Sequence, residues 1–216
     1  MIENDIIRAK QIEKYNTVAL EHAHTSRAVL WDDPQTQYLR FHELTRHLNL
    51  DDSSKSLLDI GCGNGELYKF LNFSGYRGHY VGYDINEMLL DKARERFKSI
   101  EVQCVDILAI EPIQRFDYVV LSGLFNLNVG QTMNWVQVFI KRMFEMTNQV
   151  MVFNAISSHV SQRDDGMYYM DPAEMLTFCV KNLSMRTTLM HHNMPYNYTV
   201  TVFKDESWSS VKETIA

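Results

Sequence analysis

Three glycines at alternate positions, Gly61, Gly63 and Gly65, are the residues most suited to ligand binding in this chain. They follow the short apolar segment 57–60 and precede apolar residues at helical spacing. This pattern predicts a strand, a tight turn and a helix. Glycine allows positive φ and lets a ligand approach the backbone closely. Because the helix directs its N-terminal amides at the turn, the sequence predicts a ligand-binding loop here.

Glu66, directly after the third glycine, narrows the class of ligand. The dinucleotide-binding pattern G-x-G-x-x-G would need a glycine at this position. A glutamate at the start of the helix also disfavours a pyrophosphate, because two anions would compete for one helix N-terminus. A zwitterionic or cationic ligand is affected less. A nicotinamide-dependent oxidoreductase is therefore a disfavoured alternative, which the absorbance of a bound nicotinamide would reveal.

Two acids follow predicted strands downstream of the loop. Segment 80–83 is predicted to be a strand that ends at Asp84, and the alternating segment 100–104 is predicted to be a strand closed by Asp106. In α/β nucleotide-binding folds an acid at the end of the second strand accepts hydrogen bonds from both ribose hydroxyls. The spacing from Gly65 to Asp84 matches that arrangement, so we predict that Asp84 binds a ribose.

The stretch 57–71, LLDIGCGNGELYKFL, resembles the first motif of the class I S-adenosylmethionine (SAM) methyltransferases. The resemblance implies that SAM is the cofactor and that the loop holds its methionine part. It assigns the ribose to Asp84, one face of the adenine to Ile85, and the adenine edge to Asp106 with the backbone amide of Ile107. The cofactor-binding residues expected in the first motif are Asp59, Gly61, Cys62, Gly63 and Gly65.

The segment before the first strand, residues 1–52, is predicted to form two helices, over about 1–30 and 35–48. In the family that the chain resembles, such a segment commonly folds over the cofactor pocket. Tyr15, Trp31 and Arg40 are therefore pocket candidates, and the Arg40 guanidinium suits the methionine carboxylate of SAM. A surface arginine and two core aromatics are the alternative interpretation.

The remaining pattern predicts the α/β fold of the same family. We expect a doubly wound, mainly parallel seven-stranded sheet that ends in a C-terminal antiparallel hairpin, within a single domain over residues 1–216. The other predicted elements are strands at 118–121, 149–154, 185–191 and 198–204, and helices at about 131–147 and 171–181.

The loop after strand 118–121 is expected to lie over the cofactor, at the carboxyl edge of the sheet. Backbone groups at Ser122 are within expected reach of the SAM ammonium, and Phe125, Asn126 and Asn128 are expected to face the acceptor. Methylases that act on adenine N6 or on glutamine often carry Asn/Asp-Pro-Pro-Tyr/Phe here. This chain has Ser-Gly-Leu-Phe, which disfavours those two substrates.

A hydroxyl acceptor would need a general base, and histidine has a suitable pKa. His191 and His159 lie near the ends of predicted strands and are the candidate catalytic residues. His22 and His24 are not part of a clustered His/Cys pattern, so no metal site is predicted. The expected reaction is methyl transfer to an oxygen or nitrogen atom of a small metabolite or of a glycan or lipid precursor. A tRNA-base methyltransferase and a non-catalytic SAM-binding or partner-docking protein stay open.

The composition of the chain limits which partners and which cellular compartment we expect. The formal net charge of −6 argues against an extended nucleic-acid surface. The three widely spaced cysteines and the charged N-terminus favour a reducing, cytoplasmic location. The apolar runs are too short to span a membrane. The longer motif pattern resembles a bacterial group of small SAM methyltransferases, and we expect a monomer or homodimer.

Overall fold

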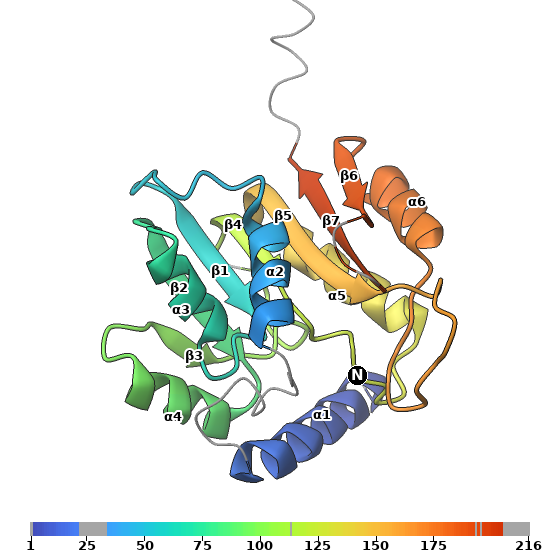
Figure 1. Ribbon diagram of the computed structural model, residues 1–216, viewed down its shortest axis with the longest axis horizontal. Coiled ribbons are helices and arrows are strands. Elements are labelled where there is room, and N and C mark those ends of the chain that lie inside the picture. The colour runs from blue at the N-terminus through green and yellow to red at the C-terminus, as the bar shows by residue number, and fades with distance from the viewer. Residues whose placement is uncertain (1, 22–33, 113, 193, 195, 205–216) are drawn as a thin grey trace, which may run out of the picture.

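Seven strands form one mixed sheet in the computed structural model, which describes residues 2–21, 34–112, 114–192, 194 and 196–204. The strand order is β3-β2-β1-β4-β5-β7-β6, and β7 is antiparallel to both β5 and β6 while the other pairs are parallel (Figure 1). The predicted fold class is thus confirmed. The strands are β1 Ser56–Ile60, β2 His79–Asp84, β3 Val102–Cys104, β4 Phe116–Leu121, β5 Thr147–Ile156, β6 Thr187–Met190 and β7 Asn197–Phe203.

Helices cover both faces of the sheet, which explains the continuous apolar runs of the central strands. On one face, α2 (Pro34–Thr45) packs onto β5 and against α3 (Glu66–Phe73), and α4 (Glu87–Arg96) packs beside β2 and β3. On the other face lie α5 (Met133–Glu145) and α6 (Pro172–Asn182). Val120 of β4 faces the first layer and Val119 faces the second, and both are fully buried.

Side-chain caps fix where the helices begin. Asn86, Thr132 and Asp171 each accept a hydrogen bond from a backbone amide in the first turn of α4, α5 and α6. The capped ends of α4 and α5 face the carboxyl edge of the sheet, where β1, β2 and β4 also end, so these elements together shape that edge.

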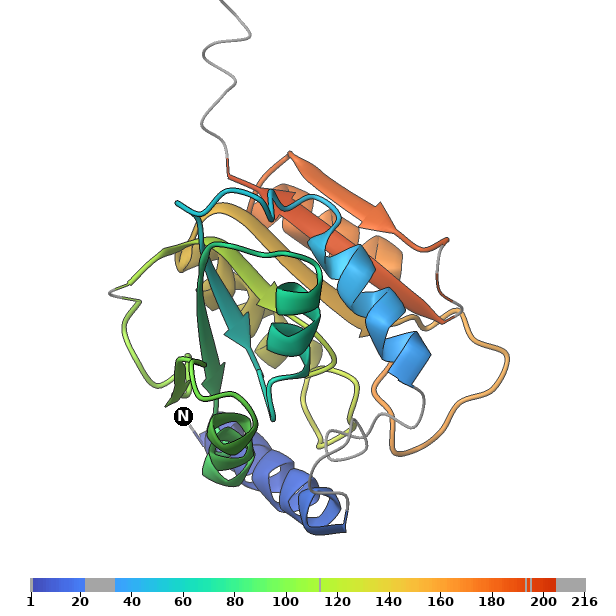
Figure 2. The same ribbon diagram turned by 60° about the vertical axis from the view of Figure 1, so that its left-hand side comes forward.

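The N-terminal helix α1 (Ile2–Glu21) lies across the carboxyl ends of the strands, beside α4 (Figures 1 and 2). Its Ile7 is buried in the same core cluster as Ile107 and Trp135. Residues 22–30 of the predicted 1–30 helix lie outside the described residues. Among the residues that the structure describes, no helix is both long and apolar enough to cross a bilayer.

Candidate active site

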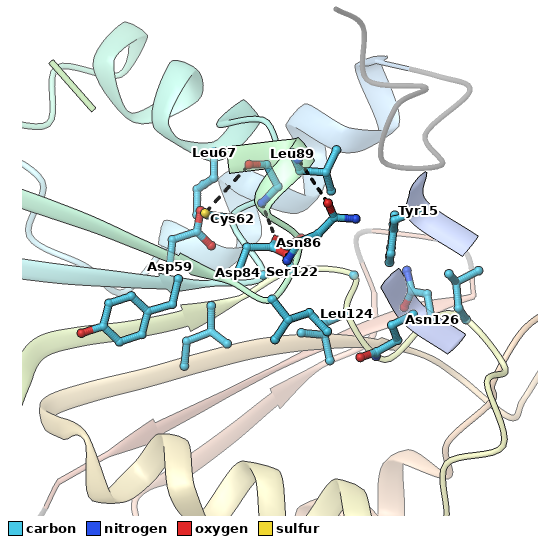
Figure 3. A pocket seen from close by; sticks show the side chains of 18 of the residues that line it. Tyr15, Asp59, Cys62, Leu67, Asp84, Asn86, Leu89, Ser122, Leu124 and Asn126 are labelled. Carbon is cyan, nitrogen blue, oxygen red and sulfur yellow. Dashed lines mark hydrogen bonds between the residues drawn. The ribbon is translucent and has the colours of Figure 1, made fainter. Parts of the chain in front are cut away.

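The glycine turn forms one wall of a cavity at the carboxyl edge of the sheet (Figure 3). Gly61, Gly63 and Gly65 have φ of 75°, 54° and 85°, values that side-chain-bearing residues rarely adopt. The Gly61 amide donates to the carbonyl of Tyr83 at 2.7 Å, which ties the turn to β2. Gly61 and Gly63 line the cavity.

Gly65, expected in the cofactor site, does not line this cavity. It is the N-cap of α3, and a Cβ there would lie 3.1 Å from both Phe97 and Ile100. The third glycine therefore permits close packing of α3 against the segment after α4. Glycine at position 65 is therefore needed for the turn to fold. The alternate spacing of the three glycines does not by itself distinguish this role from contact with a ligand.

Asp84 ends β2 and faces the cavity with its carboxylate held by backbone amides. The Gly63 amide donates to one oxygen at 2.8 Å, and the Asn86 amide donates to the other at 2.9 Å. Burial raises the pKa of Asp84, and these amides partly oppose that shift. A carboxylate has about four acceptor sites, so each oxygen can still accept one hydrogen bond from a ligand.

Asp59 and Cys62 lie at the opposite end of the cavity from Asn126 (Figure 3). The Tyr80 hydroxyl donates to the Asp59 carboxylate at 2.8 Å. Burial raises the pKa of Asp59 to about 7, against the opposing effect of the Tyr80 hydrogen bond, and Asp84 adds to the rise. Burial likewise raises the pKa of the Cys62 thiol well above its ordinary value, so this thiol stays protonated.

Glu66 does not present a free anion at the helix start. Its carboxylate is buried and forms an ion pair with Arg96 at 2.7 Å, and Arg96 also donates to the carbonyl of Asn64 at 2.8 Å. The repulsion of a pyrophosphate expected from Glu66 is therefore weaker than the sequence indicates. Glu66 and Arg96 are 30 residues apart in the sequence, and helical or strand periodicity does not predict an ion pair over that separation.

Asp106 lines the cavity beyond Asp84, with Ile85 and Ile107 nearby in the lining. The side chain of Asn4, on α1, donates to one Asp106 oxygen at 2.9 Å. The indole of Trp135 donates to the Asn4 side-chain oxygen at 3.1 Å. Asn4 thus links α1 to the adenine-binding acid that the resemblance implies. Sequence reasoning missed Asn4, because its partners lie more than 100 positions away.

Helix α2 supplies two buried polar side chains to the lining, Gln37 and Arg40. Burial lowers the pKa of Arg40 to about 9, which means that its charge is poorly solvated. The Gln37 side-chain oxygen is buried and has no hydrogen-bond partner among the described residues. An anion beside Arg40 and a donor beside Gln37 would both be favoured. Gln37 was not singled out in the sequence.

A residue of β5 holds the loop after β4 in place. The side chain of Asn154 accepts from the Gly123 amide at 3.0 Å and donates to the Ser122 hydroxyl at 2.9 Å. Ser122 and Asn126 line the cavity. Phe125 is instead buried in the core against Phe139 and Phe153, and Asn128 bonds the neighbouring loop outside the lining.

The candidate catalytic histidines lie together but outside the lining. The rings of His159 and His191 are 6.5 Å apart, and both side chains are exposed. They follow β5 and β6 and do not line the cavity, whose lining lies mainly at the ends of β1, β2, β3 and β4 and includes Ile156 of β5. Their expected contact with the reacting atoms is therefore not supported. Within the described part of the chain, no three His, Cys, Asp or Glu side chains gather closely enough to hold a metal ion.

Tyr15 lines the cavity from α1, while Trp31 lies outside the described residues. Tyr15 and Asn126 both lie toward the end of the cavity remote from Asp59 (Figure 3). Burial raises the pKa of the Tyr15 phenol, and the nearby Asp84 carboxylate raises it further. The lining thus combines an acid suited to a diol, apolar side chains, a buried cation and two buried amide oxygens, of Gln37 and Asn126, that have no hydrogen-bond partner among the described residues. This set fits SAM, which carries a ribose, an adenine and an amino-acid zwitterion.

Comparison with protein families agrees with this chemistry. A family model described as "Methyltransferase domain" matches residues 51–197, more than half of the chain. Rv1506c of Mycobacterium tuberculosis, named as a methyltransferase, is 28% identical over 155 residues, which cover 69% of this chain and 93% of that protein. The malonyl-[acyl-carrier protein] O-methyltransferase of Acetivibrio thermocellus is 34% identical over 92 residues, 40% of this chain and 32% of that one.

Solved structures share the fold at low sequence identity. Magnesium protoporphyrin IX methyltransferase from Synechocystis PCC 6803, crystallised with SAM, has a TM-score of 0.67 at 14% identity, covering 92% of this chain and 97% of that chain. N-methyltransferase NodS from Bradyrhizobium japonicum, crystallised with S-adenosylhomocysteine (SAH), has a TM-score of 0.62 at 16% identity, covering 89% of this chain and 98% of that chain.

Proposed function

This chain belongs to the class I SAM-dependent methyltransferases, and on that premise we propose that it methylates an oxygen or nitrogen atom of a small-molecule acceptor. The acceptor is a metabolite or a glycan or lipid precursor. The observation that carries this proposal is the position of α1, which lies across the carboxyl edge and contributes side chains to the lining. An acceptor that enters beneath a helix in this position must be small.

Different lining residues bind different parts of the cofactor. Asp84 accepts hydrogen bonds from the ribose hydroxyls, and Ile85 and Ile107 enclose the adenine. Asp106 accepts from the adenine amino group. These roles are supported by the position of each residue in the lining and by the remaining acceptor capacity of the two carboxylates.

The methionine part lies against the glycine turn and α2. Arg40 pairs with its carboxylate, because an anion restores the solvation that burial withholds from the guanidinium. Gln37 lies one turn earlier on the same face of α2 and accepts from the ammonium group, since its oxygen is buried and has no partner among the described residues. The backbone groups of Ser122 stay candidates for the same ammonium.

When bound, SAM supplies a methyl group already activated by a positively charged sulfur. The protein's task is to align an acceptor lone pair with the carbon–sulfur bond and to exclude water. α1 and the apolar side chains of the lining exclude water. The glycine turn and the loop held by Asn154 align the reactants, because their backbones are fixed by hydrogen bonds before the ligand arrives.

Calorimetric titration of SAH and SAM into wild-type protein and Asp84→Asn tests the cofactor assignment. Wild type is expected to bind both, and loss of a hydrogen bond to a charged group should weaken binding by about 1.5–3 kcal/mol. Asp91→Asn is the matched control, because Asp91 is an exposed acid on α4. Equal weakening of both variants would contradict the role of Asp84, and no binding to folded wild type would contradict the proposed function.

The acceptor class is tested by SAH release with small amines, alcohols and carboxylic acids, alongside unmodified tRNA. Turnover with small molecules supports the proposal. Turnover with tRNA alone would instead support a tRNA-base methyltransferase. Tight SAM binding with no turnover on either panel would support a non-catalytic SAM-binding protein. The names of the relatives include both an O- and an N-methyltransferase, so they leave the acceptor atom open.

A further inference from the structure

The side chain of Asn126 carries an unmet hydrogen-bond acceptor in the cavity lining. It is only 9% exposed, and its Oδ1 has no hydrogen-bond partner among the described residues. A buried carbonyl oxygen without a donor is unfavourable, and most such groups in folded proteins are paired. The cofactor groups are already matched to Asp84, Asp106, Arg40 and Gln37. The oxygen of Asn126 therefore points to a donor on the acceptor.

The backbone around Asn126 is fixed on both sides. Its amide donates to the carbonyl of Gly123 at 3.0 Å, and its own carbonyl accepts from the Tyr168 amide at 2.8 Å. Gly123 is in turn held by Asn154. The Asn126 side chain thus extends from a loop that β5 and the segment before α6 hold in place, and little reorganisation is needed when a donor arrives.

Few groups at this end of the cavity can remove a proton. The lining contributed by the described residues contains no histidine. Burial and Asp84 raise the pKa of Tyr15, so its phenol stays protonated. Asp59, whose pKa is about 7, lies at the far end beside Cys62 (Figure 3). A hydroxyl acceptor would lack a base here, whereas an uncharged amine offers its lone pair without prior deprotonation.

We infer that the acceptor atom is the nitrogen of an uncharged primary or secondary amine, and that Asn126 Oδ1 accepts its N–H. The nitrogen lone pair forms the new bond to the methyl carbon. The carbon–sulfur bond breaks, and its electron pair stays on sulfur. The nitrogen becomes positively charged and then loses a proton to water. The Asn126 carbonyl dipole stabilises this developing positive charge, which makes Asn126 a catalytic residue.

Because this assignment rests on the proposed function, the test uses probes that span both sites. These are SAH analogues whose sulfur is replaced by a nitrogen bearing an aminoethyl, hydroxyethyl or propyl arm. Each probe and SAH itself are titrated into wild type, Asn126→Ala, Asn126→Asp and Asn128→Ala. Asn128 is the matched control, since its side chain is exposed and bonds the carbonyl of Asp165. Thermal unfolding verifies that each variant is folded.

Wild type is expected to bind the aminoethyl probe at least about 10-fold more tightly than the propyl probe, with the hydroxyethyl probe between them. Asn126→Ala loses this preference, while Asn126→Asp and Asn128→Ala keep it. Equal binding of the three arms, tightest binding of the hydroxyethyl arm, or an unchanged preference in Asn126→Ala would overturn the inference while SAH still binds. Failure of wild type to bind SAH would overturn the proposed function as well.

Discussion

Asp59 shows how one buried acid can make the stability of this protein depend on pH. It is 2% exposed, and its only hydrogen bond that the structure records comes from the Tyr80 hydroxyl. Burial raises its folded-state pKa to about 7, above the value of about 3.9 expected in the unfolded chain. Between these two values the folded protein keeps a proton that the unfolded chain has released. Stability is therefore present at low pH and falls as the pH rises toward 7.

Asp59→Asn is expected to remove this pH dependence. The amide is uncharged at every pH and can still accept the Tyr80 hydrogen bond. The free energy of unfolding of the variant, minus that of wild type, should rise between about pH 4 and pH 7 by up to about 4 kcal/mol. Urea unfolding at several pH values measures this difference, with the exposed Asp91→Asn as control. Parallel profiles of Asp59→Asn and wild type would contradict the raised pKa.

Gly61 and Gly75 form a matched pair that separates backbone strain from ligand contact. Both have left-handed φ, at 75° and 81°. A Cβ at Gly61 would lie 3.1 Å from Leu124 in the cavity lining, whereas a Cβ at Gly75 would meet no atom within 4 Å. Alanine at either position should cost about 1–2 kcal/mol of stability from the φ angle alone.

Only Gly61→Ala is expected to weaken SAH binding, by about 10-fold or more, because the methyl group and the displaced Leu124 narrow the cavity. Calorimetry at equal folded-protein concentration measures the affinity, and denaturant unfolding measures the stability of both variants. If Gly75→Ala weakened binding as much as Gly61→Ala, general destabilisation would explain the effect and the cofactor-binding role of the turn would fail.

At the scale of elements, α1 is joined to the rest of the cavity wall by few side-chain hydrogen bonds among the described residues. Its recorded side-chain hydrogen bonds to the rest of the chain run from Glu3, Asn4 and Asn16. Asn4 alone joins α1 to both Asp106 and Trp135. A helix held by few buried contacts opens at a lower free energy than the sheet does.

Asn4→Ala should therefore loosen α1 while leaving the sheet protected. The loss of two hydrogen bonds is expected to lower the opening free energy by about 1–3 kcal/mol, which accelerates amide exchange in α1 by about 5-fold to 150-fold. Hydrogen exchange read by mass spectrometry measures both elements at once. Glu13→Ala, an exposed position on the same helix, serves as the control. Unchanged exchange in Asn4→Ala would show that apolar packing by Ile7 holds the helix instead.

The element scale also explains what the sequence predicted and what it did not. Strand-end positions are set by periodicity and loop spacing, so Asp84, Asp106 and Ser122 were placed at the correct edge. The ends of the predicted strands also place His159 and His191 at that edge, but they do not tell how far along the edge a residue lies from the cavity. Their strands lie beyond β4, where the hairpin is added to the sheet. Asn4 and Gln37 depend on how the N-terminal helices pack, which local patterns do not encode.

For the whole molecule, the site is assembled from segments that have no sequence proximity: α1, α2, the glycine turn and the ends of β2, β3 and β4. A ligand that bridges these segments binds the folded chain and not the unfolded one. It must therefore raise the free energy of unfolding of the whole protein. The same linkage tests how selective the cavity is for SAM over a nicotinamide dinucleotide, since the two ligands differ at the end that meets Arg40 and Gln37.

SAH at about 100 times its dissociation constant should stabilise wild type by about 2.7 kcal/mol, which corresponds to a rise of roughly 5–10 °C in Tm for a chain of this length. At the same SAH concentration a variant that binds about 10-fold more weakly, the smallest loss expected for Asp84→Asn, should gain only about 1.4 kcal/mol. Gly75→Ala should start from a lower Tm and shift as far as wild type does. A shift with NADH in place of SAH would mean that the paired Glu66 tolerates a pyrophosphate and that the cavity is not selective for the amino-acid end of SAM.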